Sequence, residues 1–442
     1  MKIGLGIGLV TKGLSGGAVP PFNTVAPVIS GTTIVGSTLS CTTGTWTGSP
    51  NTFIYGYQWY RNDILIIGAN SNTYVTVAAD SAAVITCVVT ANNCGIALPS
   101  NTVAPAISGT AVVGQTLTTS NGTWNGTPLT YDYRWFRGTT QIGTNSNTYT
   151  LVQTDAGNTS NITCVVTANN TAGSANATSN QIAQILTVRT GAFLTASAIS
   201  DATIRGGLNT FDIGLISNSL DTKMKALYPF VGGTASTHKF NFMNAADTNA
   251  AFRLTFFGSG THSSNGYLPN STNAYADTFL NPSIVINDNN DGHLSYYSRT
   301  DNTGINAIEI GCGDATTSFD MVLKFGGGNA AGACINMFDA NVFTNTARTD
   351  GFYVASQNNV NNIRNLYRNT TSLATQNVAQ NLTPTNYTVF IGARNGATIS
   401  APQFFTNREC AFASVGNGLS ATDVTNLYTL VQNFNTTLNR QV

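Results

Sequence analysis

Two stretches of this chain are near copies of each other, and this repeat limits the folds open to it. The run NTVAPVISGTTIVGSTLSCTTGTWTGSP begins at Asn23 and returns at Asn101 as NTVAPAISGTAVVGQTLTTSNGTWNGTP. Each copy continues with an aromatic run, YGYQWYR or YDYRWFR, and then with ITCVVTANN. Self-similarity on this scale indicates one small structural module used twice in tandem.

Each copy reads as a series of short strands. Runs 33–41, 53–61 and 84–92 carry the branched, aromatic and alternating residues that are typical of strands. Cys41, Trp59 and Cys87 follow the order of an immunoglobulin core, in which two cysteines face each other and a tryptophan packs on them. We therefore expect two immunoglobulin-like sandwiches, over residues 23–100 and 101–184. The signature P-x-I-S-G-x-x-x-V-G-x-x-L resembles that of bacterial and phage surface modules.

The cysteine pattern allows one disulfide but does not require it. Cys41 and Cys87 could be bridged in the first copy, whereas in the second copy Thr119 stands opposite Cys164. Because the second copy manages without a bridge, Cys41 and Cys87 can equally be buried thiols. The other cysteines form no C-x-x-C or Cys/His cluster, and with three histidines in the chain a zinc site is not expected.

Charge is sparse along the whole chain. Asp, Glu, Lys and Arg make up 9% of the residues, against about 25% in ordinary domains, and 19 basic residues balance 19 acidic ones. Nucleic acids and anionic membranes are therefore not expected as partners. No membrane insertion is expected from MKIGLGIGLV at the start, because this glycine-broken run is too short for a span or a secretory signal.

Residues 1–22 precede the first repeat and allow two interpretations. They can be a disordered or packed terminus, or a peptide that docks on a larger assembly by adding a strand. The glycine-rich stretch from Thr11 to Pro21 is typical of a flexible lead into the first module.

Residues 185–442 have a different texture, in which helical patterns flank many short strands. Ser200 or Asp201 can cap a helix with Ile204 and Leu208 on one side, and Ser420 with Asp423 can cap a C-terminal helix. Between them we expect strands within 238–243, 250–258, 282–288, 293–299, 305–313, 319–327, 351–357 and 386–395. The pattern predicts a mainly β chain that ends in a jelly-roll sandwich, with the two helices packed against it.

Three segments resemble the concanavalin A-like (lectin/glucanase) sandwich of bacteriophage structural proteins. They begin at Lys223 (KMKALYPFVGG), Phe252 (FRLTFFGSGTHSSNGYLPN) and Cys410 (CAFASVGNGLSATDVTNLYTLVQNF), and the resemblance covers roughly residues 190–442. Immunoglobulin-like repeats before such a domain resemble phage head fibres, spikes and tail-associated adhesins. The resemblance implies a virion-surface protein that binds other virion proteins through its N-terminal segment. It also implies a homo-oligomer, with a trimer favoured, that contacts host surface polysaccharide.

Catalysis is not expected. Glycoside hydrolases on this scaffold need two carboxylates close together, about 5–5.5 Å apart in retaining enzymes. This chain has only Glu309 and Glu409 as glutamates, and no predicted strand carries an alternating pair of carboxylates. The expected function is therefore adhesion, and the alternative is a purely structural stalk or capsid decoration protein that binds no glycan.

One stretch has the mixture of amides and aromatic rings that sugar sites use, because sugars offer hydroxyls to bond and flat C–H faces to stack on. The candidate glycan residues there are His262, Asn265, Tyr267, Asn270 and Tyr275. The competing interpretation is an ordered loop whose amides bond its own backbone.

A second candidate is the oxygen-rich turn NDNNDGH. Asp288, Asn290 and Asp291 could hold calcium there. The same residue types are typical of a hairpin loop, and the turn departs from the calcium-loop pattern. We therefore expect no cofactor.

Overall fold

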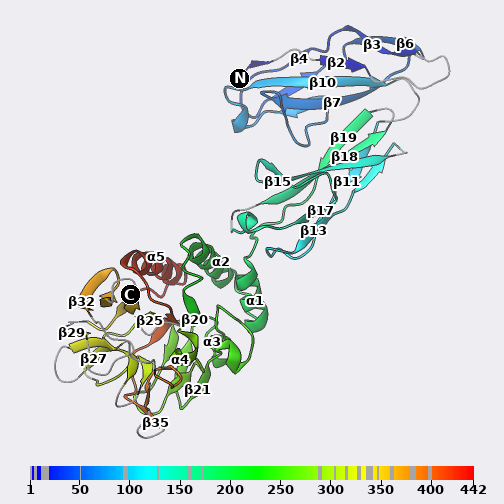
Figure 1. The fold of residues 1–442 in the computed structure, drawn as a ribbon. Helices are drawn as coiled ribbons and strands as arrows, with labels where there is room; N and C mark the ends of the chain where they lie inside the picture. Colours follow the sequence, from blue (N-terminus) through cyan, green and yellow to red (C-terminus); the bar gives the residue numbers. More distant parts are fainter. Residues whose placement is uncertain are drawn as a thin grey trace. The chain divides into compact units, whose positions relative to one another are not determined.

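The computed structural model forms two compact units (Figure 1). It describes the chain except residues 1, 4–6, 11–18, 50, 93–97, 127–128, 158, 160, 171–172, 287–290, 303–304, 314–316, 326–329, 335–341, 346–347, 359–362, 378–384 and 397–400. The first unit holds both sequence repeats, and the second, here called the sandwich unit, is Leu186–Val442 with residues 156–158. The chain is mainly β, as expected, with two immunoglobulin-like sandwiches followed by a larger sandwich with helices.

The first module pairs its strands in three sheets, ordered β1-β10-β7-β8 with β2 also on β10, β4-β5-β9, and β3-β6. Its elements are β1 (Lys2–Ile3), β2 (Ile7–Val10), β3 (Val19–Val25), β4 (Ile29–Ser30), β5 (Thr38–Cys41), β6 (Thr45–Ser49), β7 (Ile54–Arg61), β8 (Ile64–Leu65), β9 (Thr73–Val75), the 3₁₀ turn η1 (Ala78–Asp80) and β10 (Val84–Asn92).

The second module repeats this plan in sheets ordered β16-β15-β18-β19, β12-β13-β17 and β11-β14. Its elements are β11 (Ser100–Val103), β12 (Ile107–Ser108), β13 (Thr116–Thr119), β14 (Thr123–Asn125), β15 (Thr130–Arg137), β16 (Thr140–Ile142), β17 (Thr148–Thr150), η2 (Gln153–Asp155), β18 (Ile162–Asn170) and β19 (Gly173–Thr178).

The two modules share an interior built around one tryptophan each. Trp59 and Trp135 are fully buried, and their ring centroids lie 5.5 and 5.7 Å from those of Tyr74 and Tyr149. Each indole N–H donates to a backbone carbonyl, 2.8 Å away, so the polar atom of the ring is satisfied.

Each module also buries one carboxylate, which the sequence patterns did not single out. Arg61 Nε donates to Asp80 Oδ1 at 2.6 Å, and the Tyr74 hydroxyl donates to Asp80 Oδ2 at 2.8 Å. Arg137 and Tyr149 bind Asp155 in the same way, at 2.7 and 2.8 Å. Local partners therefore compensate the buried charge in both copies.

The first module contains no disulfide between its two core cysteines. Cys41 and Cys87 are buried free thiols that belong to one hydrophobic core cluster. Of the two alternatives left open by the sequence, the structure therefore shows the buried thiols.

The modules differ at one edge of the larger sheet. In the second module β19 runs antiparallel to β18. In the first module β1 and β2 run parallel to β10, with Ile7 opposite Val88 and Val10 opposite Ala91. Within residues 1–22, the described strands β1 and β2 thus pair with the module that follows them, and β3 starts four residues before Asn23.

The sandwich unit stacks two sheets, ordered β22-β23-β36-β25-β30-β31-β32 with β20 on β36, and β21-β24-β33-β26-β27-β28-β29 with β34 and β35. Its strands are β20 (Met224–Tyr228), β21 (Thr255–Phe257), β22 (Thr261–Ser263), β23 (Gly266–Leu268), β24 (Tyr275–Asp277), β25 (Gly292–Ser298), β26 (Ile310–Gly313), β27 (Ser318–Phe325), β28 (Ala330–Cys334), β29 (Val342–Asn345), β30 (Gly351–Asn358), β31 (Ile363–Arg368), β32 (Thr371–Asn377), β33 (Phe390–Ile391), β34 (Arg394–Gly396), β35 (Ala401–Gln403) and β36 (Cys410–Gly416). Alternate residues of both sheets, such as Tyr296, Val415, Ile310 and Met321, meet in one buried core.

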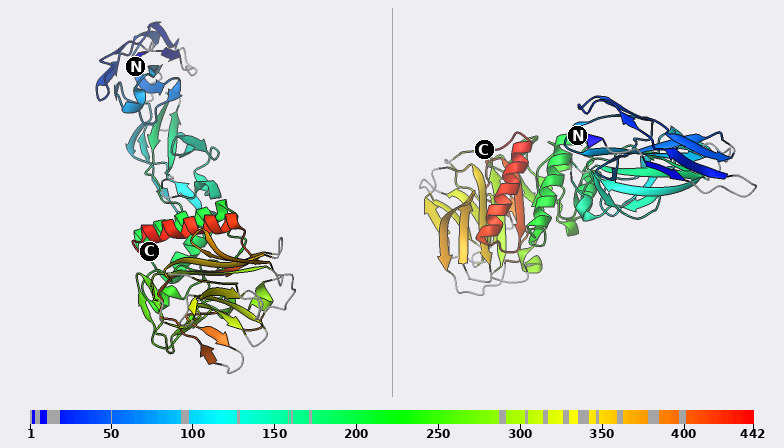
Figure 2. Two further views of the ribbon diagram at one scale, coloured as in Figure 1. Left: turned by 90° about the vertical axis from the view of Figure 1, so that its left-hand side faces the viewer. Right: turned by 90° about the horizontal axis from the view of Figure 1, so that it is seen from above.

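Helices cover the outer side of the sheet that contains β36 (Figure 2). They are α2 (Ala202–Ser217) and α5 (Ala421–Thr437), with α1 (Val188–Ser197) packed beside α2, and α3 (Ala235–His238), η3 (Asn249–Ala251) and α4 (Pro282–Val285) elsewhere. Phe211 of α2 lies 5.6 Å from Phe412 of β36 and 5.5 Å from Phe434 of α5, between ring centroids. The two helices predicted at the ends of this unit are therefore confirmed and lie side by side.

Two of the predicted strands were wrong. His238 ends α3 and residues 239–243 form turns, while residues 282–285 form α4, in which Pro282 occupies the first helical turn and Asn281 caps it. Proline favours a helix start because its missing N–H would be unpaired there in any case.

Candidate functional site

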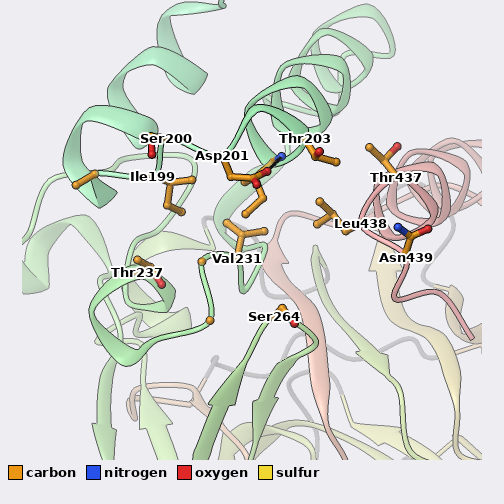
Figure 3. Close-up of a pocket in the computed structure, with 14 residues that line it drawn as sticks. Ile199, Ser200, Asp201, Thr203, Val231, Thr237, Ser264, Thr437, Leu438 and Asn439 are labelled. Atoms are coloured by element: carbon orange, nitrogen blue, oxygen red, sulfur yellow. Dashed lines mark hydrogen bonds between the residues drawn. The ribbon is translucent and has the colours of Figure 1, made fainter.

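A pocket of about 520 Å³ opens where α1 and α5 end and α2 begins (Figure 3). The ends of α1 and α2 contribute one wall and the end of α5 another, while the loop at Val231 and the turn of the β22–β23 hairpin close the rest. Side chains from both ends of the sandwich unit therefore meet in one cavity.

The lining combines apolar and hydroxyl-bearing side chains. The apolar ones are Ile199, Ile204, Val231 and Leu438, with Ala198. The polar ones are Ser200, Asp201, Thr203, Thr237, Ser264, Thr437 and Asn439. A few polar groups around an apolar surface are typical of small-molecule pockets.

Helix capping places Asp201, the acid of the lining. Asp201 is the N-cap of α2, and its Oδ1 accepts a hydrogen bond from the Ile204 N–H at 2.8 Å. α1 ends just before it, at Ala198 in the left-handed conformation. The cap fixes the carboxylate at the pocket mouth, since an aspartate there satisfies an otherwise unpaired helix N–H.

Two glycines let the Val231 loop pass close to its neighbours. A Cβ on Gly232 would lie 2.7 Å from the Thr237 side chain, and one on Gly233 would lie 3.3 Å from the Ser264 backbone nitrogen. Both have positive φ, +88° and +73°, which favours glycine. This close approach brings Thr237 and Ser264 to the same pocket.

Arg440 holds the pocket walls together from beneath. Its Nη2 donates to Pro229 O at 2.6 Å and its Nη1 to Phe230 O at 2.7 Å, while Nε donates to Asn435 Oδ1 at 2.7 Å. The side chain is 1% exposed. Burial, together with the nearby positive charge of Arg299, lowers the pKa of Arg440 to about 9. The guanidinium therefore ties the end of α5 to the pocket loop instead of facing a ligand.

Two histidines pack under the hairpin. His238 Nδ1 and His262 Nδ1 are 3.0 Å apart, so one ring donates to the other. Burial lowers the pKa of His238 to about 3, with contributions from His262 and Arg440, and burial also lowers the pKa of His262. Both rings are thus neutral at pH 7 and add no charge to the pocket.

This arrangement suits a small uncharged ligand that is rich in hydroxyl groups. Among the described residues of the lining, Asp201 is the one that carries a charge, so an anionic ligand would meet a carboxylate and no cation there. The side chains of Ser200, Ser264 and Asn439 have no hydrogen-bond partner within the described part of the chain and are left to a ligand or to solvent. Carboxylate, amide and hydroxyl groups bond sugar hydroxyls in both directions.

The predicted glycan residues do not gather in one place. His262 contacts Tyr267, with ring centroids 5.0 Å apart, but Tyr267 is 0% exposed and stacks on Phe230. Tyr267 therefore has no free face for a sugar. Asn265 is exposed in the hairpin turn next to Ser264, which does line the pocket.

The other two predicted glycan residues stabilise their own surroundings. Asn270 Oδ1 accepts three backbone N–H bonds at 3.0 Å, from Thr272, Asn273 and Ala274. This matches the alternative of an ordered loop. Tyr275 stacks between Phe257 and Phe390, at centroid distances of 4.8 and 4.6 Å.

Of the three calcium-turn candidates, the structure describes one. Asp288 and Asn290 of the calcium turn lie outside the described residues, and Asp291 Oδ1 accepts the Gly418 N–H at 3.0 Å. Among the residues that the structure describes, no group of three or more His, Cys, Asp or Glu side chains could hold a metal. No helix in the described ranges is long and apolar enough to cross a membrane.

Both glutamates are engaged in ion pairs. Glu309 is fully buried, pairs with Arg408 and accepts the Leu323 N–H at 2.8 Å. Glu409 pairs with Arg299 at 2.7 Å. Neither carboxylate lines the pocket.

Sequence reasoning missed Asp201, Thr437 and Asn439 as pocket residues. The sequence did place Asp201 at a helix start and predicted that the two terminal helices pack together. The available signal for a polar site was the capping residue, because a helix cap places polar groups at the end of a helix. Which helix ends meet in one pocket depended on tertiary packing.

Comparison with known proteins places the chain in no named family. No protein-family model matches it, and no curated protein is similar to it.

Solved structures show partial likeness. Domain 4 of AbnA, a GH43 extracellular arabinanase from Geobacillus stearothermophilus, is 15% identical, with 46% of this chain and 98% of that one covered and a TM-score of 0.29. The CBM40 of the Ruminococcus gnavus IT-sialidase is 13% identical, with 32% and 83% covered and a TM-score of 0.26. The NanB sialidase from Streptococcus pneumoniae is 12% identical, with 36% and 27% covered and a TM-score of 0.29.

The chain spans only about a quarter of the NanB structures, 26% and 27% of their lengths. At these scores the likeness carries neither a ligand nor an activity over to this chain. Its own sheets and helices define the class: a modular β protein with two immunoglobulin-like domains and a larger two-sheet β-sandwich.

Proposed function

We propose that this protein is an adhesin that binds neutral glycans through the pocket of its sandwich unit. The observation that carries the proposal is the pocket lining, in which hydroxyls, one amide and one carboxylate surround apolar side chains without a facing cation. Such a site gives weak individual contacts, which many copies on one particle would multiply through effective concentration.

The proposed setting is the surface of a phage virion, with host surface polysaccharide as the ligand. The resemblance of residues 190–442 to phage sandwich domains supports this setting, and the tandem modules suit a protein that extends outward. In this setting the N-terminal segment contacts other virion proteins, copies associate with one another, and the protein has no catalytic role. The pairing of both glutamates with arginines supports the last point.

A structural stalk or decoration protein without glycan binding is the second candidate. The burial of Tyr267 and the loop-forming bonds of Asn270 favour it, because both residues serve the fold of the sandwich unit.

A glycan array that includes host lipopolysaccharide, capsule and neutral oligosaccharides, probed with the full chain, tests the proposal. Asp201→Ser keeps a helix cap but removes the carboxylate, and Asn439→Gly keeps the positive φ of 55° while removing the amide. We expect binding by the wild-type chain and at least about a tenfold loss in the double variant, because two hydrogen-bonding groups are removed.

The matched control is Asn433→Ala, which removes an exposed amide on α5 outside the pocket and should leave binding unchanged. Glycan binding that survives in the double variant would show that the glycan site lies outside this pocket. No binding to any glycan, with or without calcium, would favour the structural candidate.

A further inference from the structure

The first module exposes a group of large aliphatic side chains at one end. They are Ile34, Val35, Ile64, Val75, Val77 and Val84, between 36% and 73% exposed, and are called the apolar end below. Single exposed aliphatic residues are ordinary on protein surfaces, but a contiguous group marks an interaction site.

Hydrogen bonds show that Ile34, Val75 and Val77 of this group lie next to one another. The Thr76 hydroxyl donates to Ile34 O at 2.7 Å, and the Gly36 N–H donates to Thr76 O at 2.9 Å. Thr76 is buried, so its neighbours Val75 and Val77 flank it beside the Ile34 loop.

The buried ion pair connects this part to the rest of the group. The Val77 N–H donates to Asp80 Oδ2 at 2.7 Å, and Asp80 binds Arg61, the last residue of β7. Ile64 pairs with Arg61 in the following hairpin. The Asn62 N–H donates to Val84 O at 2.8 Å, which completes the apolar end.

The second module keeps valine at three of the six equivalent positions, Val112, Val113 and Val152, and is polar at the other three, which the shared pairings identify. Thr140 pairs with Arg137 as Ile64 pairs with Arg61. Thr150 pairs with Thr116 as Val75 pairs with Thr38. The Gly138 N–H donates to Asn161 O as the Asn62 N–H donates to Val84 O. The same fold is therefore stable with Thr, Thr and Asn there, and its interior does not require the aliphatic residues.

We propose that the apolar end of the first module is the surface through which a second copy of this chain docks. Arg61 and Asp80 neutralise each other, and at the margin Asp63 stands beside Ile64 while Lys2 pairs with Val84, so the formal charges of this surface sum to zero. A surface without net charge selects an apolar partner, and a second copy offers the same surface, so one contact covers both copies at once.

The size of the surface fits this role. The six side chains expose on the order of 600 Å² per copy, at the upper end for the largest apolar patch of a monomer. A standard interface buries about 800 Å² per partner, so the apolar end would supply its core and neighbouring polar groups its rim. This inference does not depend on glycan binding, because the pocket belongs to the other unit.

Sedimentation velocity of the full chain over a concentration series tests the proposal. The wild-type chain should associate reversibly. Ile64→Thr with Val75→Thr, which installs the residues of the second module, should raise the dissociation constant at least tenfold. Val152→Thr removes an exposed aliphatic residue of the second module and should leave association unchanged.

Ile34→Thr with Val77→Thr is an independent second variant of the same surface, and thermal unfolding shows which variants keep the fold. A wild-type chain that stays monomeric at the highest concentration would overturn the proposal. Association of either folded double variant with wild-type strength would overturn it as well. Glycan binding by these variants, measured separately, would stay intact if the pocket is the glycan site.

Discussion

The immunoglobulin-like modules and the sandwich unit bury charged groups in different ways. In each module the arginine, tyrosine and aspartate of the ion-pair cluster lie within about twenty positions of one another, and the cluster occurs twice. In the sandwich unit Arg440 bonds Pro229 and Phe230, and Arg408 pairs with Glu309. The modules therefore satisfy buried charge locally, whereas the sandwich unit does so with residues distant in sequence.

The histidines sharpen this contrast. The chain has three, His238, His262 and His293, and all lie in the sandwich unit. His293 is fully buried between Asn417 O at 2.6 Å and the Ser414 hydroxyl at 3.0 Å. Burial lowers its pKa to about 4, although the bond to Asn417 and the charge of Asp423 oppose the shift.

The largest expected effect is that acid destabilises the sandwich unit before the modules. The unfolded chain takes up protons near pH 6.5, whereas folded His238 and His293 resist protonation until about pH 3 and 4. Stability of this unit should fall as pH drops from about 6.5 to 4, by on the order of 3 kcal/mol for each ring.

In the first module the acid-sensitive window lies lower. Burial raises the pKa of Asp80, but hydrogen bonds from Val77, Arg61 and Tyr74 lower it further, so the net shift is downward. Its stabilisation is lost only below about pH 4. Calorimetry of the full chain at several pH values checks the order, and His293→Gln should flatten the response. Equal acid sensitivity of both units would contradict this contrast.

The next largest effect concerns the buried aspartate and its arginine partner, which both modules contain. Asp80→Asn and Asp155→Asn should each destabilise their own module by about 3–5 kcal/mol, since each change leaves a partly buried arginine without its carboxylate. Denaturant unfolding, followed by the fluorescence of Trp59 or Trp135, measures both losses. A large loss in one copy only would show that the clusters are not equivalent.

A smaller effect tests where the modules differ. Oxidation should join Cys41 to Cys87, because both buried thiols pack in the same core cluster, and stabilise the first module by about 2–4 kcal/mol. Unfolding with and without reductant measures this gain, and Cys41→Ala should abolish it. Thr119→Cys should give the second module the same response, and failure there would mean that the two cores differ in geometry.

The sequence predicted the repeated modules and the terminal helices for clear physical reasons. The repeat is visible in the sequence itself, so it predicted the two modules directly. Asp201, Ser420 and Asp423 are strong capping residues, and the structure confirms their positions at the helix starts. Short apolar runs were less decisive. The run at Pro282 forms a helix because a proline start and an Asn281 cap outweigh its β-branched residues.

The candidate site was less predictable. Amide and aromatic side chains near residue 270 indicated a sugar site, yet Tyr267 faces the core, because successive residues of a strand point to opposite sides. The pocket instead uses polar groups at three helix ends, which carry no motif of their own.

The sequence by itself determined the modular β architecture and the low, balanced charge, because the repeat, the local periodicity of the strands and the composition specify them. Only the tertiary structure decided that Asp201 and Asn439 share a pocket and that Arg440 secures it from beneath. It also decided which aliphatic residues of the first module stay exposed. These features depend on packing between segments far apart in the chain, which no local pattern encodes.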